Sequence, residues 1–128
     1  MPRRLLVALA VAGSAFIAAC GEEGIEVAKS DPDYEGAKIF QQRCSACHTL
    51  TAAGTEGSAT NANDRERKDG PNFDQRKETK DGVLYAIRNG GFSGGLMPQD
   101  IVVGEDAEKV ADFVAKYSGS EVTNAPSP

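Results

Sequence analysis

The sequence is short of the side chains that most metal and catalytic sites use. Its 128 residues contain one His, three Cys and two Met, and no Trp. This supply is too small for a multinuclear metal site, and a single His cannot give two imidazole ligands to one metal ion. Because one Met is the first residue, Met97 is the one thioether left for a folded domain.

Positive charge is also scarce. The 14 Lys and Arg residues face 19 Asp and Glu residues, which gives a net charge of −5. Nucleic acid is therefore not expected as a partner, because phosphate contacts need a basic surface. Six Pro and 14 Gly are too few for a collagen-like or wholly disordered chain. The length corresponds to one domain.

The chain has one long apolar run, the 13 uncharged residues 5–17 that follow Arg3 and Arg4. A membrane-spanning helix needs about 20 such residues, whereas a signal peptide has a shorter apolar region behind a basic start. The next residues, Ile17-Ala18-Ala19-Cys20, resemble the lipobox at which bacterial lipoproteins are lipidated on Cys and cleaved before it. We therefore expect residues 1–19 to be a lipoprotein-type signal peptide and Cys20 to be the lipid attachment site. The alternative is a Cys within an ordinary, discarded signal.

The segments beside the predicted domain differ from it in composition. Residues 20–31 are acidic and lack an apolar period, so we expect a flexible tether. Residues 119–128 are polar and rich in Pro at their end, which predicts a disordered tail. Residues 32–118 form the predicted domain. We expect an exported protein, lipid-anchored at the outer face of the bacterial cytoplasmic membrane or in the periplasm, with the membrane as one partner.

Helical patterns occur three times in the predicted domain, over about residues 32–44, 81–89 and 105–117. Asp31 before Pro32 is typical of a helix start, and Gly90 is typical of a helix end. No segment alternates well enough to be a strand, so the predicted class is all-α. These helices make a thin core, and we expect something else to fill its centre.

The chemistry is concentrated in Cys44-Ser45-Ala46-Cys47-His48. Cys-x-x-Cys-His is the attachment motif of c-type haem. Two intervening residues let both sulfurs reach the two vinyl groups on one side of a porphyrin, and the next His lies under the iron. A thioredoxin-like redox pair is one alternative, but it would follow a strand in an α/β pattern. A soft-metal site is another, and it lacks a fourth protein ligand other than Met97.

Met97 is the candidate for the second axial position on the iron. It lies 49 residues beyond His48, in Gly94-Gly95-Leu96-Met97-Pro98, where the glycines allow the backbone to approach a flat ring. The alternative is a Met that only fills the core. A thioether ligand favours ferrous iron and therefore raises the reduction potential.

Residues 33–118 resemble the class I cytochromes c, especially the small bacterial monohaem members. The features that carry the resemblance follow in chain order: a first helix with Gly36 and Phe40, the haem motif, Gly70-Pro71-Asn72-Phe73, Ile87-Arg88-Asn89-Gly90, Met97-Pro98, and a closing helix with Phe113 and Tyr117. The resemblance implies a small all-α fold, with about three main helices and short turns wrapped around one covalently attached haem c. In the family the Pro carbonyl accepts the Nδ1–H of the proximal His, which assigns this role to Pro71. Phe73 stands where Leu is usual and would pack on the haem ring.

Two departures from the family pattern concern the surroundings of the haem. Residues 49–69 make the connection from His48 to Pro71 longer than in compact members. We expect a solvated loop there, with a partner-docking loop as the alternative. The chain also lacks the Trp that binds a haem propionate in many members, and Arg88 or Tyr85 could take that role instead.

The predicted function is that of a monomeric electron carrier between respiratory or other redox partner proteins. Six-coordinate iron leaves no site for a substrate, and no catalytic set can be built elsewhere because the one His is committed to iron. The protein is therefore not expected to be an enzyme by itself. Two alternatives stay open: a haem-bearing subunit of a larger oxidoreductase, and a small-gas sensor in which Met97 is labile.

Overall fold

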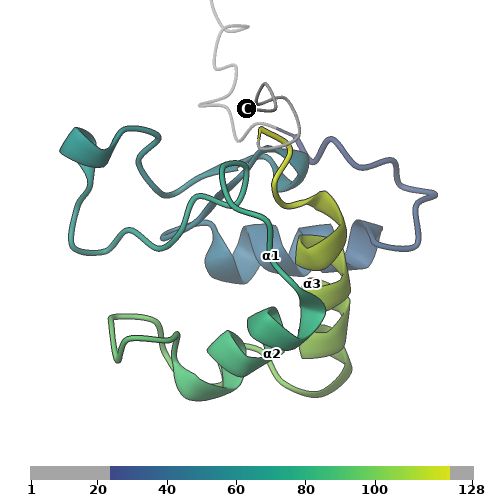
Figure 1. Cartoon of the computed structure of the whole chain (residues 1–128). Helices are drawn as coiled ribbons and strands as arrows, with labels where there is room; N and C mark the ends of the chain where they lie inside the picture. Colours follow the sequence, from purple (N-terminus) through teal and green to yellow (C-terminus); the bar gives the residue numbers. More distant parts are fainter. Residues whose placement is uncertain (1–23, 122–128) are drawn as a thin grey trace, which may run out of the picture.

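The computed structural model describes residues 24–121 (Figure 1). This part of the chain contains three α-helices and two short 3-10 helices: α1 (Tyr34–Cys44), η1 (Thr51–Ala53), η2 (Ala62–Asp64), α2 (Lys80–Asn89) and α3 (Gly104–Tyr117). The prediction of a small fold with three main helices is confirmed. None of the described helices is long and apolar enough to span a membrane. The signal peptide, Cys20 and residues 122–128 lie outside the described residues and stay predictions.

Local capping explains where the helices begin and end. α2 begins after Thr79, whose hydroxyl accepts a hydrogen bond from a first-turn amide at 3.2 Å, and ends at Gly90, which has φ 70°. α1 begins slightly later than predicted. Asp31 accepts a hydrogen bond from the amide of Asp33 at 2.8 Å in a preceding turn, and the helix starts at Tyr34. Asp31 therefore shapes the entry to α1 without being its N-cap.

A short antiparallel hairpin follows the Cys-x-x-Cys-His motif, and the sequence does not predict it. Strand β1 (Thr49–Leu50) pairs with β2 (Thr55–Glu56), and Gly54 turns the chain between them with φ 63°. The Leu50 amide donates to Thr55 Oγ1 at 3.0 Å, and Thr49 Oγ1 donates to the Ser58 carbonyl at 2.8 Å. Two-residue strands are too short to show an alternating pattern, so no strand signal was available.

The prediction of a solvated loop over residues 49–69 is wrong for its first half. Leu50 and Ala53 are completely buried, and Ser58 is nearly so. Residues 60–68, in contrast, are all exposed. We call residues 60–69 the arm, because they extend away from the helices (Figure 1).

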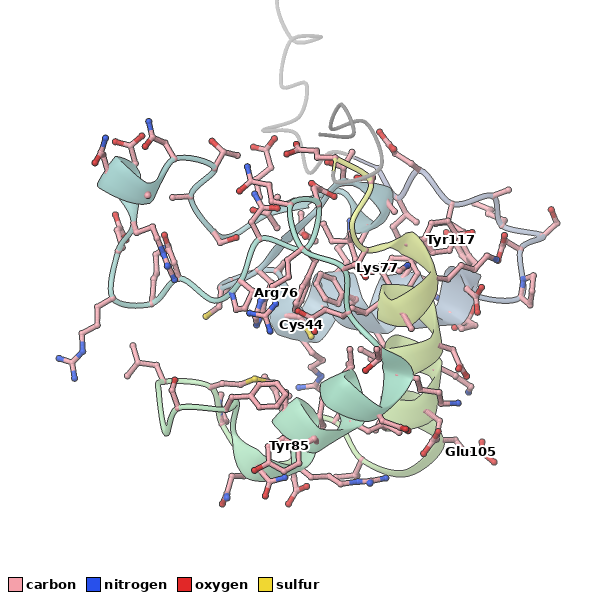
Figure 2. All side chains as sticks on the ribbon, in the orientation of Figure 1. Cys44, Arg76, Lys77, Tyr85, Glu105 and Tyr117 are labelled. Atoms are coloured by element: carbon pink, nitrogen blue, oxygen red, sulfur yellow. The ribbon has the colours of Figure 1, made fainter. Side chains whose placement is uncertain are left out.

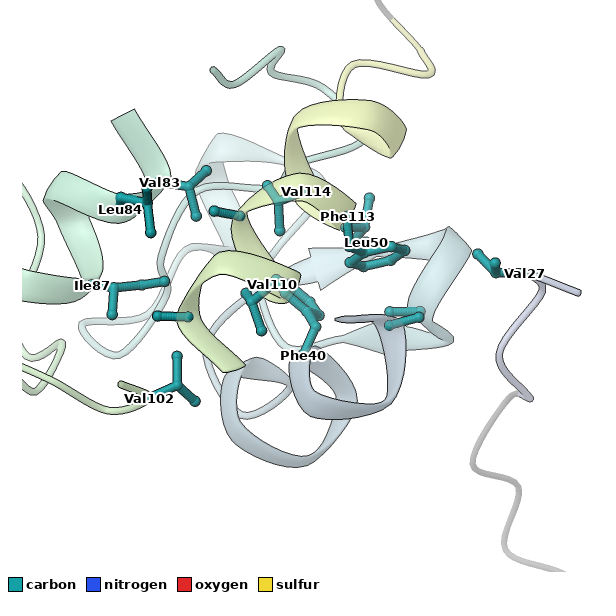
Figure 3. Packing of buried hydrophobic residues seen from close by; sticks show 14 residues of the cluster. Val27, Phe40, Leu50, Val83, Leu84, Ile87, Val102, Val110, Phe113 and Val114 are labelled. Atoms are coloured by element: carbon teal, nitrogen blue, oxygen red, sulfur yellow. The ribbon is translucent and has the colours of Figure 1, made fainter. Parts of the chain in front are cut away.

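The core lies where α1 contacts α3 (Figure 3). Phe40 of α1 and Phe113 of α3 are buried, and their ring centroids are 5.9 Å apart. The two helices approach most closely at Gly36. A Cβ at this position would lie 2.8 Å from Phe113 Cβ and would also meet the carbonyl oxygen of Lys109. The absence of a side chain at Gly36 therefore permits the close approach of α1 and α3.

The segment before α1 lies against the domain, which differs from the flexible tether predicted for residues 20–31. Val27 is 7% exposed and belongs to the buried apolar cluster. The amide of Glu26 donates to the Ala52 carbonyl at 3.2 Å. The sequence does not predict this contact, because the segment is acidic and its two apolar residues, Ile25 and Val27, make only a weak pattern.

An ionic cluster ties the same segment to the C-terminal end of α3, where Tyr117 lies (Figure 2). Lys116 Nζ is 2.7 Å from Asp33 and 3.3 Å from Asp31, and the Tyr117 hydroxyl donates to Asp31 at 2.8 Å. The hydrogen bond from the Asp33 amide, followed by the one from Tyr117, lowers the pKa of the Asp31 carboxyl. The hydrogen bond to Asp33 raises the pKa of Lys116. The cluster thus favours the charged forms of both partners.

The first residues of the predicted disordered tail, 119–128, are also held by the domain. The Gly119 amide donates to the Phe73 carbonyl at 2.7 Å, and the Glu121 amide donates to the Asp74 carbonyl at 2.9 Å. These bonds join the end of α3 to the segment that precedes α2.

Replacing Gly36 with Ala should destabilise the protein by about 1–3 kcal/mol, because the added methyl group would overlap α3 at its backbone and at Phe113. Guanidinium unfolding followed by circular dichroism measures the effect. Gly24→Ala is the matched control, since nothing lies within 4 Å of a Cβ at Gly24. Equal midpoints for both variants would show that Gly36 does not limit the approach of the helices.

Candidate functional site

The Cys-x-x-Cys-His motif occupies the turn at the end of α1. The amides of Cys47 and His48 donate to the Cys44 carbonyl at 3.2 and 3.0 Å, which closes the turn. Both Cys residues and His48 line one cavity, and Cys44 lies at the end of α1 (Figure 2). The motif is therefore folded so that its three reactive side chains share one space.

His48 is held by three neighbours. Its Nδ1 lies 3.0 Å from the Pro71 carbonyl oxygen and must be the donor, because a carbonyl can only accept. The Phe73 ring stacks on the imidazole, with centroids 4.7 Å apart and an interplanar angle of 8°. Gly70 is so close that a Cβ there would lie 2.6 Å from Nδ1. The structure thus puts Pro71 in hydrogen-bond contact with His48, and Nε2 is the nitrogen left to bind a metal ion.

Burial sets the protonation of the motif. It lowers the pKa of His48, against the smaller effect of the hydrogen bond to Pro71, so the imidazole is neutral near pH 7. Burial, followed by the nearby Cys47, raises the pKa of the Cys44 thiol to about 12. An uncharged sulfur suits this environment, which favours a thioether over a thiolate ligand to a metal ion. Within residues 24–121, no group of three or more His, Cys, Asp or Glu side chains could hold a metal ion.

The cavity has a volume of about 440 Å³ and is lined by side chains from all three helices, including Ile87 of α2 and Val114 of α3. Met97 lines it from residues 90–98, the loop that follows α2. In Figure 1 this loop lies below α1, and the Cys-x-x-Cys-His motif follows the end of α1, so the two candidate ligands reach the cavity from different segments. Gly90 allows the loop to fold back, because a Cβ there would lie 2.7 Å from the Met97 carbonyl oxygen.

The donor set of this cavity fits haem. Two thiols, a neutral imidazole nitrogen and a thioether sulfur are the groups that attach and ligate a c-type haem. Protein interiors are close-packed, so a cavity of this size in a small domain marks the place of a ligand. The sequence-based expectation that something fills a thin core agrees with this volume.

Arg88 is not among the side chains that line the cavity, although the sequence predicts that it contacts the cofactor. Its side chain is 62% exposed and lies 3.7 Å from Glu108 of α3. Helical phase explains the difference, because Ile87 faces the core and the next residue therefore points away from it. Tyr85, the alternative to Arg88, is also outside the cavity. It is exposed on α2 and stacks on Phe92 with centroids 5.0 Å apart (Figure 2).

Other basic residues, which sequence reasoning missed, line the cavity instead. They are Arg43, Arg65, Arg67, Lys68 and Arg76. Arg76 forms an ion pair of 2.5 Å with Glu78, which also lines the cavity. One signal could have found Arg43, since it directly precedes the haem motif. The length of residues 49–69 was the signal for Arg65, Arg67 and Lys68, because that insertion returns to the cavity through the arm.

Comparisons with known proteins identify the family. The model of the cytochrome c family matches residues 34–118, which include all three helices, the Cys-x-x-Cys-His motif and Met97. The crystal structure of the c-type cytochrome SorU from Sinorhizobium meliloti is 33% identical in sequence, with a TM-score of 0.53. The match covers 68% of this chain and 91% of that one. No curated protein matches the chain. The chain belongs to the cytochrome c family, and it is an electron-transfer protein with covalently bound haem c.

Proposed function

We propose that this protein is an exported monohaem electron carrier in which Cys44 and Cys47 form the thioether bonds and His48 and Met97 are the axial ligands. The observation that carries the proposal is the single cavity, which collects the only His, both Cys of the motif and the only Met beyond position 1. Haem supplies a reversible one-electron change of its iron when bound. Its donor and acceptor would be redox proteins.

The chain prepares His48 for this role before any metal binds. The Pro71 carbonyl accepts the Nδ1 proton, so the lone pair stays on Nε2. Contact between ring faces stops the imidazole from tilting toward Phe73. A ligand held in this way needs little rearrangement when the iron changes its oxidation state, and this favours rapid electron transfer.

Met97 decides between an electron carrier and a sensor of small gases. With His48 and Met97 both bound, the iron offers no open position to a substrate or a gas. Residues 92–96, which precede Met97, are all exposed, so this ligand is carried by a surface loop. The strength of the bond between Met97 and the iron is therefore the quantity to measure.

Replacing Met97 with Ala should open one coordination position, lower the reduction potential and let the ferrous protein bind carbon monoxide. Optical spectra with and without carbon monoxide, together with a redox titration, measure these effects. Val103→Ala, a change in an exposed apolar residue that does not line the cavity, should leave them as in the wild type. Ready carbon monoxide binding by the wild-type ferrous protein would contradict the carrier proposal and favour the gas sensor.

Replacing Gly70 with Ala should weaken the bond between His48 and the iron, because the new methyl group would push the imidazole away from the Pro71 carbonyl. We expect a changed reduction potential and altered haem absorption in the purified variant. Gly95 lines the same cavity, but the atom nearest to a Cβ there would be Ser93 Oγ at 3.8 Å, so Gly95→Ala should cause no clash. It serves as the control, and identical spectra and potentials in both variants would refute the role given to Gly70.

We also propose that lipid on Cys20 anchors the protein to a membrane. Support comes from the Ile17-Ala18-Ala19-Cys20 sequence. Because Val27 is buried against the domain, Ile25 lies near the domain surface, and the five positions from Cys20 to Ile25 span at most about 18 Å. The domain would therefore lie closer to the bilayer than a flexible tether over residues 20–31 would place it.

Replacing Cys20 with Ser should move the protein from the membrane fraction to the soluble exported fraction, because the lipid can no longer be attached. Fractionation of cells followed by detection of covalent haem measures the distribution. Gly21→Ser keeps the Cys and should stay with the membrane. Continued membrane association of the Cys20 variant would contradict the lipid anchor while leaving the electron-carrier proposal intact.

A further inference from the structure

One side chain, that of Asp69, closes the long connection between the haem motif and Pro71. Its Oδ2 accepts hydrogen bonds from the amide of Ala59 at 3.1 Å and from the amide of Glu66 at 3.0 Å. The side chain is only 3% exposed, although it stands at the end of the exposed arm. Burial of a carboxylate is tolerated here because backbone amides compensate its charge. Asp69 therefore joins the two ends of a loop, residues 59–69, which we call the closed loop.

The Asp69 carboxyl is held in its charged form. The hydrogen bond from the Glu66 amide, followed by the one from the Ala59 amide, lowers the pKa of Asp69. Lys68 adds an ion pair, with its Nζ 3.3 Å from Asp69 Oδ1. Lys68 is itself 54% exposed, and ion pairs of exposed side chains contribute little. The two backbone amides are therefore the main partners of the carboxylate.

Both ends of the closed loop are bonded to the haem motif. Directly before the loop, the Ser58 amide donates to Thr49 Oγ1 at 3.0 Å, and Ser58 Oγ accepts from the Thr49 amide at 3.1 Å. Thr49 is the residue that follows the motif. Directly after the loop, the Gly70 amide donates to the Cys47 carbonyl at 2.7 Å. Asp69 thus completes a ring of contacts that leaves the motif at one end of the loop and returns to it at the other.

The two residues that follow Asp69 hold the imidazole of the motif. A Cβ at Gly70 would lie 2.6 Å from His48 Nδ1, and the Pro71 carbonyl oxygen lies 3.0 Å from the same nitrogen. Packing does not hold the chain that leads to them, because residues 60–68 are all exposed. If the loop were not closed, the conformational freedom of the arm would therefore extend to the two residues that contact His48.

We propose that Asp69 is a positioning residue for the axial ligand: by closing the loop, it keeps Gly70 and Pro71 against His48. This inference rests on the proposed ligation of the iron by His48. A hydrogen bond at the outer nitrogen makes an imidazole a stronger donor to its metal, which favours ferric iron. Loss of Asp69 should therefore weaken the bond at Nδ1 and raise the reduction potential.

The charge of Asp69 offers a second route to a raised potential. Asp69 lines the haem cavity, so removal of a negative charge there disfavours ferric iron without any movement of His48. The two routes differ at the Nδ1 proton, which only the positioning role affects. The potential alone is therefore not a sufficient measurement.

The Nδ1 proton can be followed directly, because His48 is the only His of the chain. Isotope-labelled histidine in the untagged, full-length haem protein gives a single ring N–H signal for NMR. Its exchange with solvent is measured in the reduced protein, alongside a redox titration. The wild-type proton should exchange slowly, because the hydrogen bond to the Pro71 carbonyl must open first.

Three variants separate the two routes. Asp69→Ala removes the acceptor of both amides and should accelerate the exchange about fivefold or more, with a raised potential. Asp69→Asn removes the same charge but keeps an oxygen that can accept from these amides, so its exchange should lie between the wild-type and Ala values. Asp64→Ala removes a carboxylate from an exposed position of the arm, and its exchange and potential should stay as in the wild type. If Asp69→Ala does not retain haem, Asp69→Asn carries the test alone and should still exchange faster than the wild type.

Two results would overturn the positioning role. The first is a wild-type exchange rate in Asp69→Ala, or in Asp69→Asn if only that variant retains haem. Together with a raised potential, it would show that Asp69 acts through its charge alone. The second is an equal acceleration in Asp64→Ala, which would show that closure of the loop is not the cause. Both leave the electron-carrier function standing. That function would fail separately if the ring protons of His48 lacked the strong upfield shift that a haem ring imposes on its axial ligand.

Discussion

The whole arrangement depends on holding one buried imidazole at the cavity so that its Nε2 stays free to bind the iron. A buried polar nitrogen is costly unless it has a partner, and the Pro71 carbonyl gives Nδ1 that partner at 3.0 Å. Phe73 covers one face of the ring, and the missing side chain of Gly70 leaves room beside it. These contacts come from a segment that begins more than twenty positions after His48, so the connecting residues must fold back to the motif. The hairpin and the buried residues that follow it accomplish that return.

The same contacts link the haem site to the stability of the fold. Phe73 stacks on His48 and also meets the edge of Phe40 at 5.9 Å, and Phe40 in turn meets Phe113 at 5.9 Å. The end of α3 is joined to Phe73 as well, because the Gly119 amide donates to its carbonyl at 2.7 Å. A continuous set of aromatic rings therefore runs from the proximal side of the haem to the contact between α1 and α3. We therefore expect a change in the contact between α1 and α3 to alter the position of the His48 ring.

Features encoded over a few neighbouring residues were predictable from the sequence, and features made by distant contacts were not. The helices follow from apolar spacing and capping, and the Cys-x-x-Cys-His motif is local by nature. Pro71 and Met97 reach the cavity as the order of family motifs suggested. The position of Arg88 outside the cavity lining was not predicted, because its assignment did not take into account which face of α2 it lies on. The burial of Val27 was not predictable, because the neighbouring hairpin has strands too short to leave a sequence pattern. The place of the arm's basic residues at the cavity was not predictable either, because it depends on how an insertion folds back.

Electron transfer by this protein depends on one haem that is covalently bound to two cysteines, Cys44 and Cys47. Intact-mass measurement of the mature wild-type protein after acid–acetone extraction tests this most directly, with the Cys44→Ala/Cys47→Ala variant beside it. We expect the wild-type polypeptide to keep the mass of one haem and the double variant to lose it entirely. Extraction of the haem from the wild-type protein, or its retention in the double variant, would show that these two cysteines do not attach it.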